Sequence, residues 1–233
     1  MCIIVIVEMK TERWKRAQIA EKKYWLSSSK TWSTENAAWY WQQMLSRGFA
    51  LDYEFFAGKS VLEVGCGPAG IIFQLHNTKS RVGLEPMELK DLIIDGKKIS
   101  IVKKGIGEEM PFENESFDVV LSFNALDHSV NPVKVIQEIQ RVLRKDGDFL
   151  LWIYVLRNHY QFLQGFLNVV DSPHPYHFTL SQLLRHIEES SFEIKYRKNE
   201  KGTGLPNNTI KKTVANHMMD TLWLWSKKGS RLV

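Results

Sequence analysis

Cysteine is scarce in this chain of 233 residues, which contains only Cys2 and Cys66. Two cysteines supply no disulfide framework, and no group of Cys and His has the spacing of a structural metal site. Long apolar runs are also lacking, because the opening run at residues 3–7 is far shorter than the roughly 20 residues that span a bilayer. These absences predict a cytoplasmic protein with no metal and no membrane anchor.

Internal repeats and low-complexity stretches are absent too, and the length suits one α/β domain with an N-terminal extension. The 31 basic residues exceed the 26 acidic ones, for a formal net charge of +5. Several basic side chains gather near the N-terminus, at Lys10, Arg13, Lys15, Arg16, Lys22 and Lys23. A solvated helix face is the favoured interpretation, and attraction of an anionic substrate or nucleic acid is the alternative.

Residues 1–48 are aromatic and charged, and we expect them to form a helical N-terminal cap. The apolar residues 3–7 are interpreted either as an edge strand or as a leader before Met9. Residues 27–29 are serines that predict a break, and Ser33 or Thr34 is a candidate N-cap for a second helix.

Five of the eight tryptophans lie in this segment, at positions 14, 25, 32, 39 and 41. The seven-residue steps from Trp25 to Trp32 to Trp39 suggest one helical face. Core packing is the common explanation of such a stripe. The sharper hypothesis is a lid of aromatic rings over a cofactor and acceptor.

Beyond residue 48, strand and helix patterns alternate, which predicts an α/β fold with a mostly parallel sheet and helices on both faces. Predicted strands cover 60–65, 80–85, 99–104, 117–122, 148–155, 192–198 and 219–226, and predicted helices cover 69–77, 88–95, 132–144 and 180–190. The helix at 132–144 has the clearest signals, because Asn131 can cap it, Pro132 suits its first turn and Gly147 can end it.

The run from Val61 to Gly70 carries the main functional signal, since an apolar strand leads directly into Gly65, Gly67 and Gly70. Glycine lets the backbone turn sharply and approach a ligand, and the following helix start offers free N–H groups. The spacing fits a dinucleotide loop, with Glu85 about 20 residues beyond as a ribose-binding acid. The loop alone does not choose its cofactor.

A second block of residues favours one cofactor. It contains Met110-Pro111-Phe112, then Ser116-Phe117-Asp118-Val119-Val120, Leu126-Asp127-His128 and Arg141-Val142-Leu143 in that order. With Glu63 two residues before the first glycine, the chain resembles the class I S-adenosylmethionine-dependent methyltransferases, and more narrowly their type 11 branch, over roughly residues 58 to 156. The resemblance implies a Rossmann-like seven-stranded sheet over 49–233, with the last strand antiparallel, and an acceptor-pocket insertion at about 157–180.

The resemblance also implies a cofactor site at the carboxyl ends of the strands. It places Glu63 near the methionine amino group of S-adenosylmethionine and Glu85 at the ribose. Met87 is expected to cover the adenine or to be ordinary packing. The family's adenine-binding Asp is replaced by Ile106, so backbone groups of Ile106 and Gly107 are expected there. The full set of expected cofactor contacts is Glu63, Gly65, Cys66, Gly67, Glu85, Pro86, Met87, Ile106, Gly107, Glu108, Ser122 and Asn124. One of Glu108 and Glu109 is expected to face solvent.

Three histidines are candidate catalytic residues. His128 follows the fourth strand and is interpreted either as a general base or as a residue that caps the loop. His174 and His177 lie in the insertion beside Tyr176, where they either shape a polar acceptor site or belong to a surface turn fixed by prolines.

These observations predict an enzyme that transfers the methyl group of S-adenosylmethionine, leaving S-adenosylhomocysteine, to an oxygen or nitrogen of a small molecule. The Asp/Asn-Pro-Pro-aromatic motif of adenine methyltransferases is absent, and neither cysteine suits cytosine C5 chemistry, so nucleic acid is not favoured. The alternatives are a cofactor-binding homologue without turnover, a nicotinamide-dependent oxidoreductase and an RNA methyltransferase.

Overall fold

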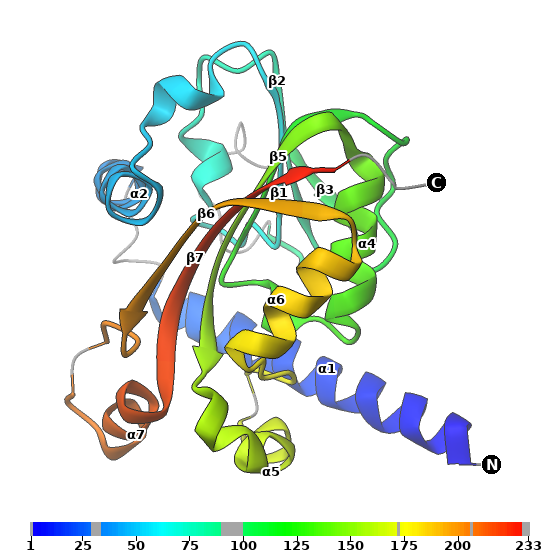
Figure 1. The fold of residues 1–233 in the computed structure, drawn as a ribbon, viewed down its shortest axis with the longest axis vertical. Helices are drawn as coiled ribbons and strands as arrows, with labels where there is room; N and C mark the ends of the chain where they lie inside the picture. Colours follow the sequence, from blue (N-terminus) through cyan, green and yellow to red (C-terminus); the bar gives the residue numbers. More distant parts are fainter. Residues whose placement is uncertain (1, 29–33, 90–99, 172, 206, 230–233) are drawn as a thin grey trace.

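A seven-stranded sheet forms the centre of the protein (Figure 1). The computed structural model describes residues 2–28, 34–89, 100–171, 173–205 and 207–229. Its strands are β1 (Ser60–Val64), β2 (Ser80–Glu85), β3 (Val102–Lys104), β4 (Phe117–Phe123), β5 (Leu143–Leu156), β6 (Phe192–Lys201) and β7 (Met219–Lys228). The strand order is β3-β2-β1-β4-β5-β7-β6, with β7 antiparallel to both neighbours and the other pairs parallel. The predicted α/β fold is confirmed.

Helices cover both faces of this sheet. The α-helices of the described residues are α1 (Cys2–Ser28), α2 (Thr34–Phe49), α4 (Pro132–Val142), α5 (Gln164–Val170), α6 (Leu180–Glu189) and α7 (Ile210–Met218). The short 3₁₀ helices are η1 (Tyr53–Phe56), η2 (Ile71–Phe73), η3 (Leu126–His128) and η4 (Asn158–Leu163). Figure 1 shows α2 on one face, α4 and α6 on the other, and α1 running past the end of the sheet.

Two hydrophobic cores result from the alternation of side chains along the strands. Leu62 and Val120 point to the core shared with α4 and α6, whereas Val61 and Leu121 point to the core shared with α2 and η2. The central strands are buried on both faces and consist of nearly continuous apolar residues, as expected of parallel strands in such a sheet.

The loop after β1 differs from its predicted helix over 69–77. Only Ile71–Phe73 forms a 3₁₀ helix, and backbone groups of this loop bond side chains from other parts of the chain. The Glu63 carboxylate accepts the N–H of Ile72, and the Arg81 guanidinium donates to the carbonyl of Leu75. The predicted helix over 88–95 lies largely outside the described residues.

Helix α4 ends at Val142, two residues before its predicted end, and Gly147 does not cap it. Leu143 is already extended and pairs with Phe117, so the chain passes directly from helix to strand. Gly147 lies where the register between β4 and β5 shifts, and a Cβ there would meet the carbonyl oxygen of Arg144 at 2.9 Å. This glycine therefore allows the irregular pairing of β5 with β4.

The N-terminal segment consists of two helices in the described part. The edge strand considered for residues 3–7 is wrong, because these residues extend α1. Adding a residue to an existing helix needs no new nucleation, so the helix formed by the residues after Met9 can extend backwards through the apolar residues 3–7. The single face through Trp25, Trp32 and Trp39 is also wrong, because Trp25 and Trp39 belong to different helices. Trp39 is 68% exposed, and Trp32 lies outside the described residues. None of the helices in the described part of the chain is both long and apolar enough to cross a membrane.

Candidate cofactor and acceptor site

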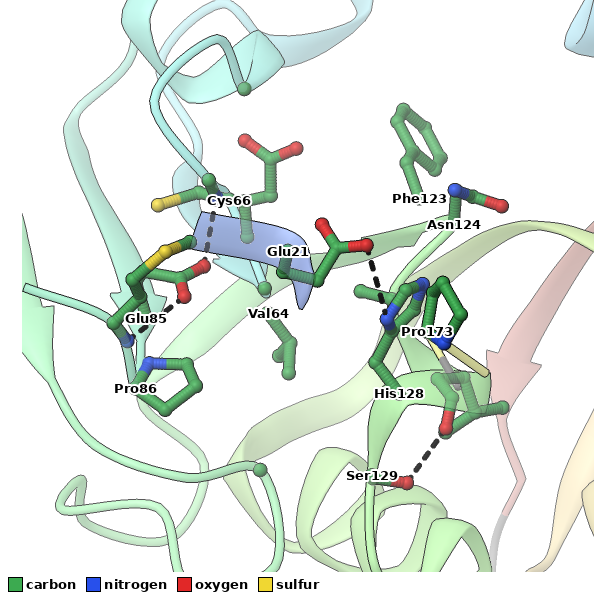
Figure 2. A pocket seen from close by; sticks show the side chains of 18 of the residues that line it. Glu21, Val64, Cys66, Glu85, Pro86, Phe123, Asn124, His128, Ser129 and Pro173 are labelled. Atoms are coloured by element: carbon green, nitrogen blue, oxygen red, sulfur yellow. Dashed lines mark hydrogen bonds and ion pairs between the residues drawn. The ribbon is translucent and has the colours of Figure 1, made fainter. Parts of the chain in front are cut away.

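A cavity of about 660 Å³ lies at the carboxyl ends of β1, β2 and β4. Loops after these strands form one side of it, and α1 covers the other side (Figure 2). The predicted cofactor residues at its wall are Glu63, Gly65, Cys66, Gly67, Glu85, Pro86, Met87, Ile106, Gly107, Glu108 and Asn124. Ser122 is buried and does not line the cavity. The loops that follow β1, β2, β3 and β4 therefore meet at this cavity.

The glycine loop has a shape that other residues would disturb. Gly65 and Gly67 adopt φ values of 72° and 51°, which favour glycine. A Cβ on Gly70 would lie 2.4 Å from the carbonyl oxygen of Cys66 and 2.5 Å from Oε2 of Glu63. The backbone of this loop can therefore lie directly against a ligand.

Two buried carboxylates flank the loop. Glu63 Oε2 accepts the N–H of Ile72 at 2.8 Å, and burial raises the pKa of Glu63 to about 8. Glu85 accepts the N–H groups of Gly67 at 2.9 Å and Met87 at 3.0 Å, and burial raises its pKa to about 7. Buried acids cost free energy unless they serve a polar partner, so both carboxylates are suited to receive ligand donors.

The loop over 105–109 lies beside the expected adenine region. Ile106 is 38% exposed, and Gly107 lies close to Val135. Glu108 lines the cavity, but its carboxylate accepts the N–H groups of Val130 and Asn131 at 2.7 and 3.0 Å. It therefore fastens this loop to the start of α4, while Glu109 is the member of the pair that faces solvent.

Asn124 lines the cavity and adopts a φ of 51°. Its Oδ1 is buried and has no hydrogen-bond partner among the described residues. The Ser122 hydroxyl is likewise unpartnered, but it lies behind the wall. An unpaired buried acceptor at a cavity wall is positioned for a ligand donor.

Two of the three candidate histidines line the cavity. His128 lies on η3, 3.7 Å from Glu21 Oε1, and burial lowers its pKa. The ring of His174 lies 4.7 Å from that of His128, centre to centre. Burial opposes charge on His174, but the hydrogen bond to Asp171 and nearby carboxylates outweigh this effect and raise its pKa. His177 is buried behind the wall, where it bonds Asn168.

Helix α1 supplies wall residues that sequence reasoning missed. Glu21 reaches between Glu85 and His128 (Figure 2), and Gln18 and Tyr24 also line the cavity. The signal was present, because Trp14, Gln18, Glu21 and Trp25 follow helical steps of four, three and four residues. Aromatic side chains from α2, β4 and β5 complete this side of the wall; they are Tyr40, Trp41, Phe123, Trp152 and Tyr154.

The strand order with a single antiparallel strand, together with the glycine loop between two buried carboxylates, defines a class I S-adenosylmethionine-dependent methyltransferase fold. Residues 62–151 match the methyltransferase type 11 family, described as a methyltransferase domain. This match confirms the resemblance seen in the sequence.

Individual relatives share this domain. The chain is 34% identical over 110 residues to the sarcosine/dimethylglycine N-methyltransferase of Aphanothece halophytica, covering 40% of this chain and 37% of that protein. It is 30% identical over 128 residues to the tRNA U34 carboxymethyltransferase of Photobacterium profundum, covering 51% and 37%. The chain thus spans little more than a third of these relatives.

A solved structure extends the likeness beyond the matched domain. The geranyl diphosphate C-methyltransferase of Streptomyces coelicolor, in complex with Mg²⁺, geranyl diphosphate and S-adenosylhomocysteine, superposes with a TM-score of 0.63 at 12% identity. The match covers 76% of this chain and 78% of that one. At this identity the likeness concerns the fold.

Proposed function

We propose that the protein is an S-adenosylmethionine-dependent methyltransferase that acts on a small molecule at oxygen or nitrogen. The observation that carries this proposal is one cavity whose wall holds two sets of residues, which we call its cofactor half and its acceptor half. Glu63, Glu85 and the glycine loop form one half, and Glu21, His128 and aromatic rings form the other. The first half suits the cofactor, and the second offers room for an acceptor beside it.

The residues of the first half fit the chemical groups of the cofactor. The ionised Glu63 carboxylate can hold an ammonium, and Glu85 can accept hydrogen bonds from both ribose hydroxyls. Apolar contact from Met87 and backbone groups near Ile106 and Gly107 suit an adenine edge. When bound, S-adenosylmethionine supplies an electrophilic methyl group.

The protein's own contribution to transfer is positioning and exclusion of water. Trp25 packs above the glycine loop, where a Cβ on Gly67 would lie 3.4 Å from its indole ring. Trp41 donates its indole N–H to the carbonyl of Ala69 at 2.7 Å and so links α2 to the same loop. These rings support the hypothesis that residues 1–48 act as a cap over the cofactor. Enclosure by α1 favours an acceptor small enough to enter the cavity.

A transfer assay with methyl-labelled S-adenosylmethionine tests this function. The acceptor panel should hold amines, phenols, carboxylates and bulk tRNA, the last because one relative is named as a tRNA enzyme. Label in a small molecule that disappears in a Glu85→Gln variant supports the proposal. Label in tRNA alone would replace the proposed acceptor class, and cofactor binding without transfer to any acceptor would favour a homologue without turnover.

A further inference from the structure

Two histidines and an aspartate meet in the acceptor half of the cavity. Asp127 and His128 lie on η3, and His174 comes from the loop between α5 and α6. The N–H of Tyr176 donates to the carbonyl of Asp127, which ties this loop to η3. One ligand atom from each of the three residues lies within 4.8 Å of the other two. Metal ligands about 2.1 Å from one ion lie roughly 3–4 Å apart, so small side-chain rotations would close the site.

Two of these side chains hold buried atoms without partners. Asp127 is 4% exposed, yet its Oδ1 accepts no hydrogen bond from any described residue. Nδ1 of His128 is also buried and unbonded, and Glu21 Oε1 at 3.7 Å is too distant for a hydrogen bond. An unsatisfied buried polar atom costs about 1–3 kcal/mol. Nε2 of His128 lies 4.0 Å from Oδ1 of Asp127, so a cation bound between them would satisfy the Asp127 oxygen.

The third side chain is held in the manner of a metal-bound histidine. Nδ1 of His174 lies 2.8 Å from Oδ2 of Asp171, which leaves Nε2 to bind a ligand. Asp171 is itself held by Lys211 at 2.8 Å and by Nε2 of His177 at 3.3 Å. A carboxylate on the far nitrogen orients a metal-binding imidazole and raises its basicity. His177 therefore belongs to the supporting network rather than to the cavity wall.

The surrounding charges also favour a cation. The carboxylates of Glu21, Asp127 and Asp171 lie next to the two imidazoles, and Lys211 bonds Asp171. A dication would balance this negative charge at the point where α1 closes over the cavity.

We propose that Asp127, His128 and His174 bind a divalent transition-metal ion in the acceptor half of the cavity. Two imidazoles and one carboxylate suit Zn²⁺, Fe²⁺ or Co²⁺, and three protein ligands leave open positions toward the cavity. Binding of the ion does not depend on methyl transfer. Its role rests on the proposed function: an acceptor oxygen or nitrogen at the open position would be oriented and more easily deprotonated. This assignment departs from the sequence expectation of no metal and makes His128 a ligand rather than a general base.

Titration of the untagged, EDTA-treated full chain with Co²⁺ tests the site. We expect saturable binding of one ion, with visible absorption typical of nitrogen and oxygen ligands. His174→Gln and Asp127→Asn should each weaken binding by about 100-fold, and Asp171→Asn by about 10- to 100-fold. His76→Gln is the matched control, because His76 is exposed and lies outside the cluster; it should bind Co²⁺ as the wild type does.

Folding and cofactor binding are measured separately. Circular dichroism in EDTA shows whether each variant is folded. If a variant is unfolded, the Co²⁺ titration of the wild type still tests the proposal. Absence of stoichiometric Co²⁺ binding by the wild type would overturn the proposal, as would equal binding by folded His174→Gln. S-adenosylhomocysteine binding by the wild type in EDTA would leave the proposed function standing in either case.

Discussion

Raising the pH from 6 to 8 should tighten binding of S-adenosylhomocysteine, because its ammonium needs an ionised partner at Glu63. This carboxyl group is 1% exposed. Burial raises its pKa to about 8, and the N–H groups of Ile71 and Ile72 offset that effect only in part. The protonated acid that prevails at pH 6 cannot form the ion pair, whereas the carboxylate can.

The size of the effect follows from the fraction of Glu63 that is ionised. A pKa of about 8 leaves about 1% ionised at pH 6 and about half at pH 8, so affinity can rise by up to about 50-fold. Glu85, with a pKa of about 7, adds a second dependence centred one pH unit lower. Without cofactor, the pH dependence of folding stability has the opposite sign to that of cofactor affinity. Each carboxyl with a raised pKa stabilises the fold fully below its unfolded pKa, and this stabilisation is lost as pH rises through about 7 to 8.

Isothermal titration calorimetry at pH 6, 7 and 8 measures the prediction. A Glu63→Gln variant should lose most of the pH dependence. The control ligand is 5′-methylthioadenosine, which lacks the amino acid end and should report Glu85 alone. Equal affinity of the wild type for S-adenosylhomocysteine at pH 6 and 8 would refute the reasoning, and so would an unchanged slope in Glu63→Gln.

Three further substitutions test the site and its support. Gly70→Ala should weaken S-adenosylhomocysteine binding by at least about tenfold and lower the melting temperature, because its Cβ has no room; Gly165→Ala, with no atom within 4 Å of the added Cβ, should do neither. Trp25→Ala should weaken cofactor binding and expose α1 to limited proteolysis, with the exposed Trp39→Ala as control, and equal cleavage of both would contradict the cap. Arg141→Ala removes bonds to the carbonyls of residues 110 and 112, so urea denaturation should show a loss of about 1–3 kcal/mol while cofactor affinity stays constant.

The sheet and the glycine loop could be predicted because their signals are local. An apolar strand, then glycines that turn the chain, then an acid at the end of the next strand define β1, its loop and Glu85 within one short segment. Asn131 was correctly expected to cap α4, and its side chain does accept the N–H of Lys134. These elements depend on neighbouring residues, so their sequence is sufficient to indicate them.

Other features depend on residues far apart in the chain. The loop after β1 is held by bonds from the N–H of Ile72 to Glu63 and from Arg81 to the carbonyl of Leu75, and neither bond follows from local propensity. The meeting of His128 and His174 depends on the loop contact between Asp127 and Tyr176, across a large separation in sequence. Spacing alone could not show that these histidines share one wall while His177 lies behind it.

The acceptor cannot be inferred from the fold, because this architecture serves many substrates. Relatives that share the domain are named for acting on sarcosine and dimethylglycine and on a tRNA. The acceptor half of this cavity also contains the aromatic rings of α2, Glu21 from α1 and His174, which lie outside the block of residues that carries the family resemblance. Substitutions there should change acceptor choice more than cofactor affinity.

The most direct test of the central claim is calorimetric titration of the purified chain at pH 8 with S-adenosylhomocysteine and, separately, with NADH. We predict one-to-one saturable binding of S-adenosylhomocysteine that Gly70→Ala weakens, and no binding of NADH. Binding of NADH in its place, or of neither ligand by folded protein, would contradict the assignment of this cavity to S-adenosylmethionine.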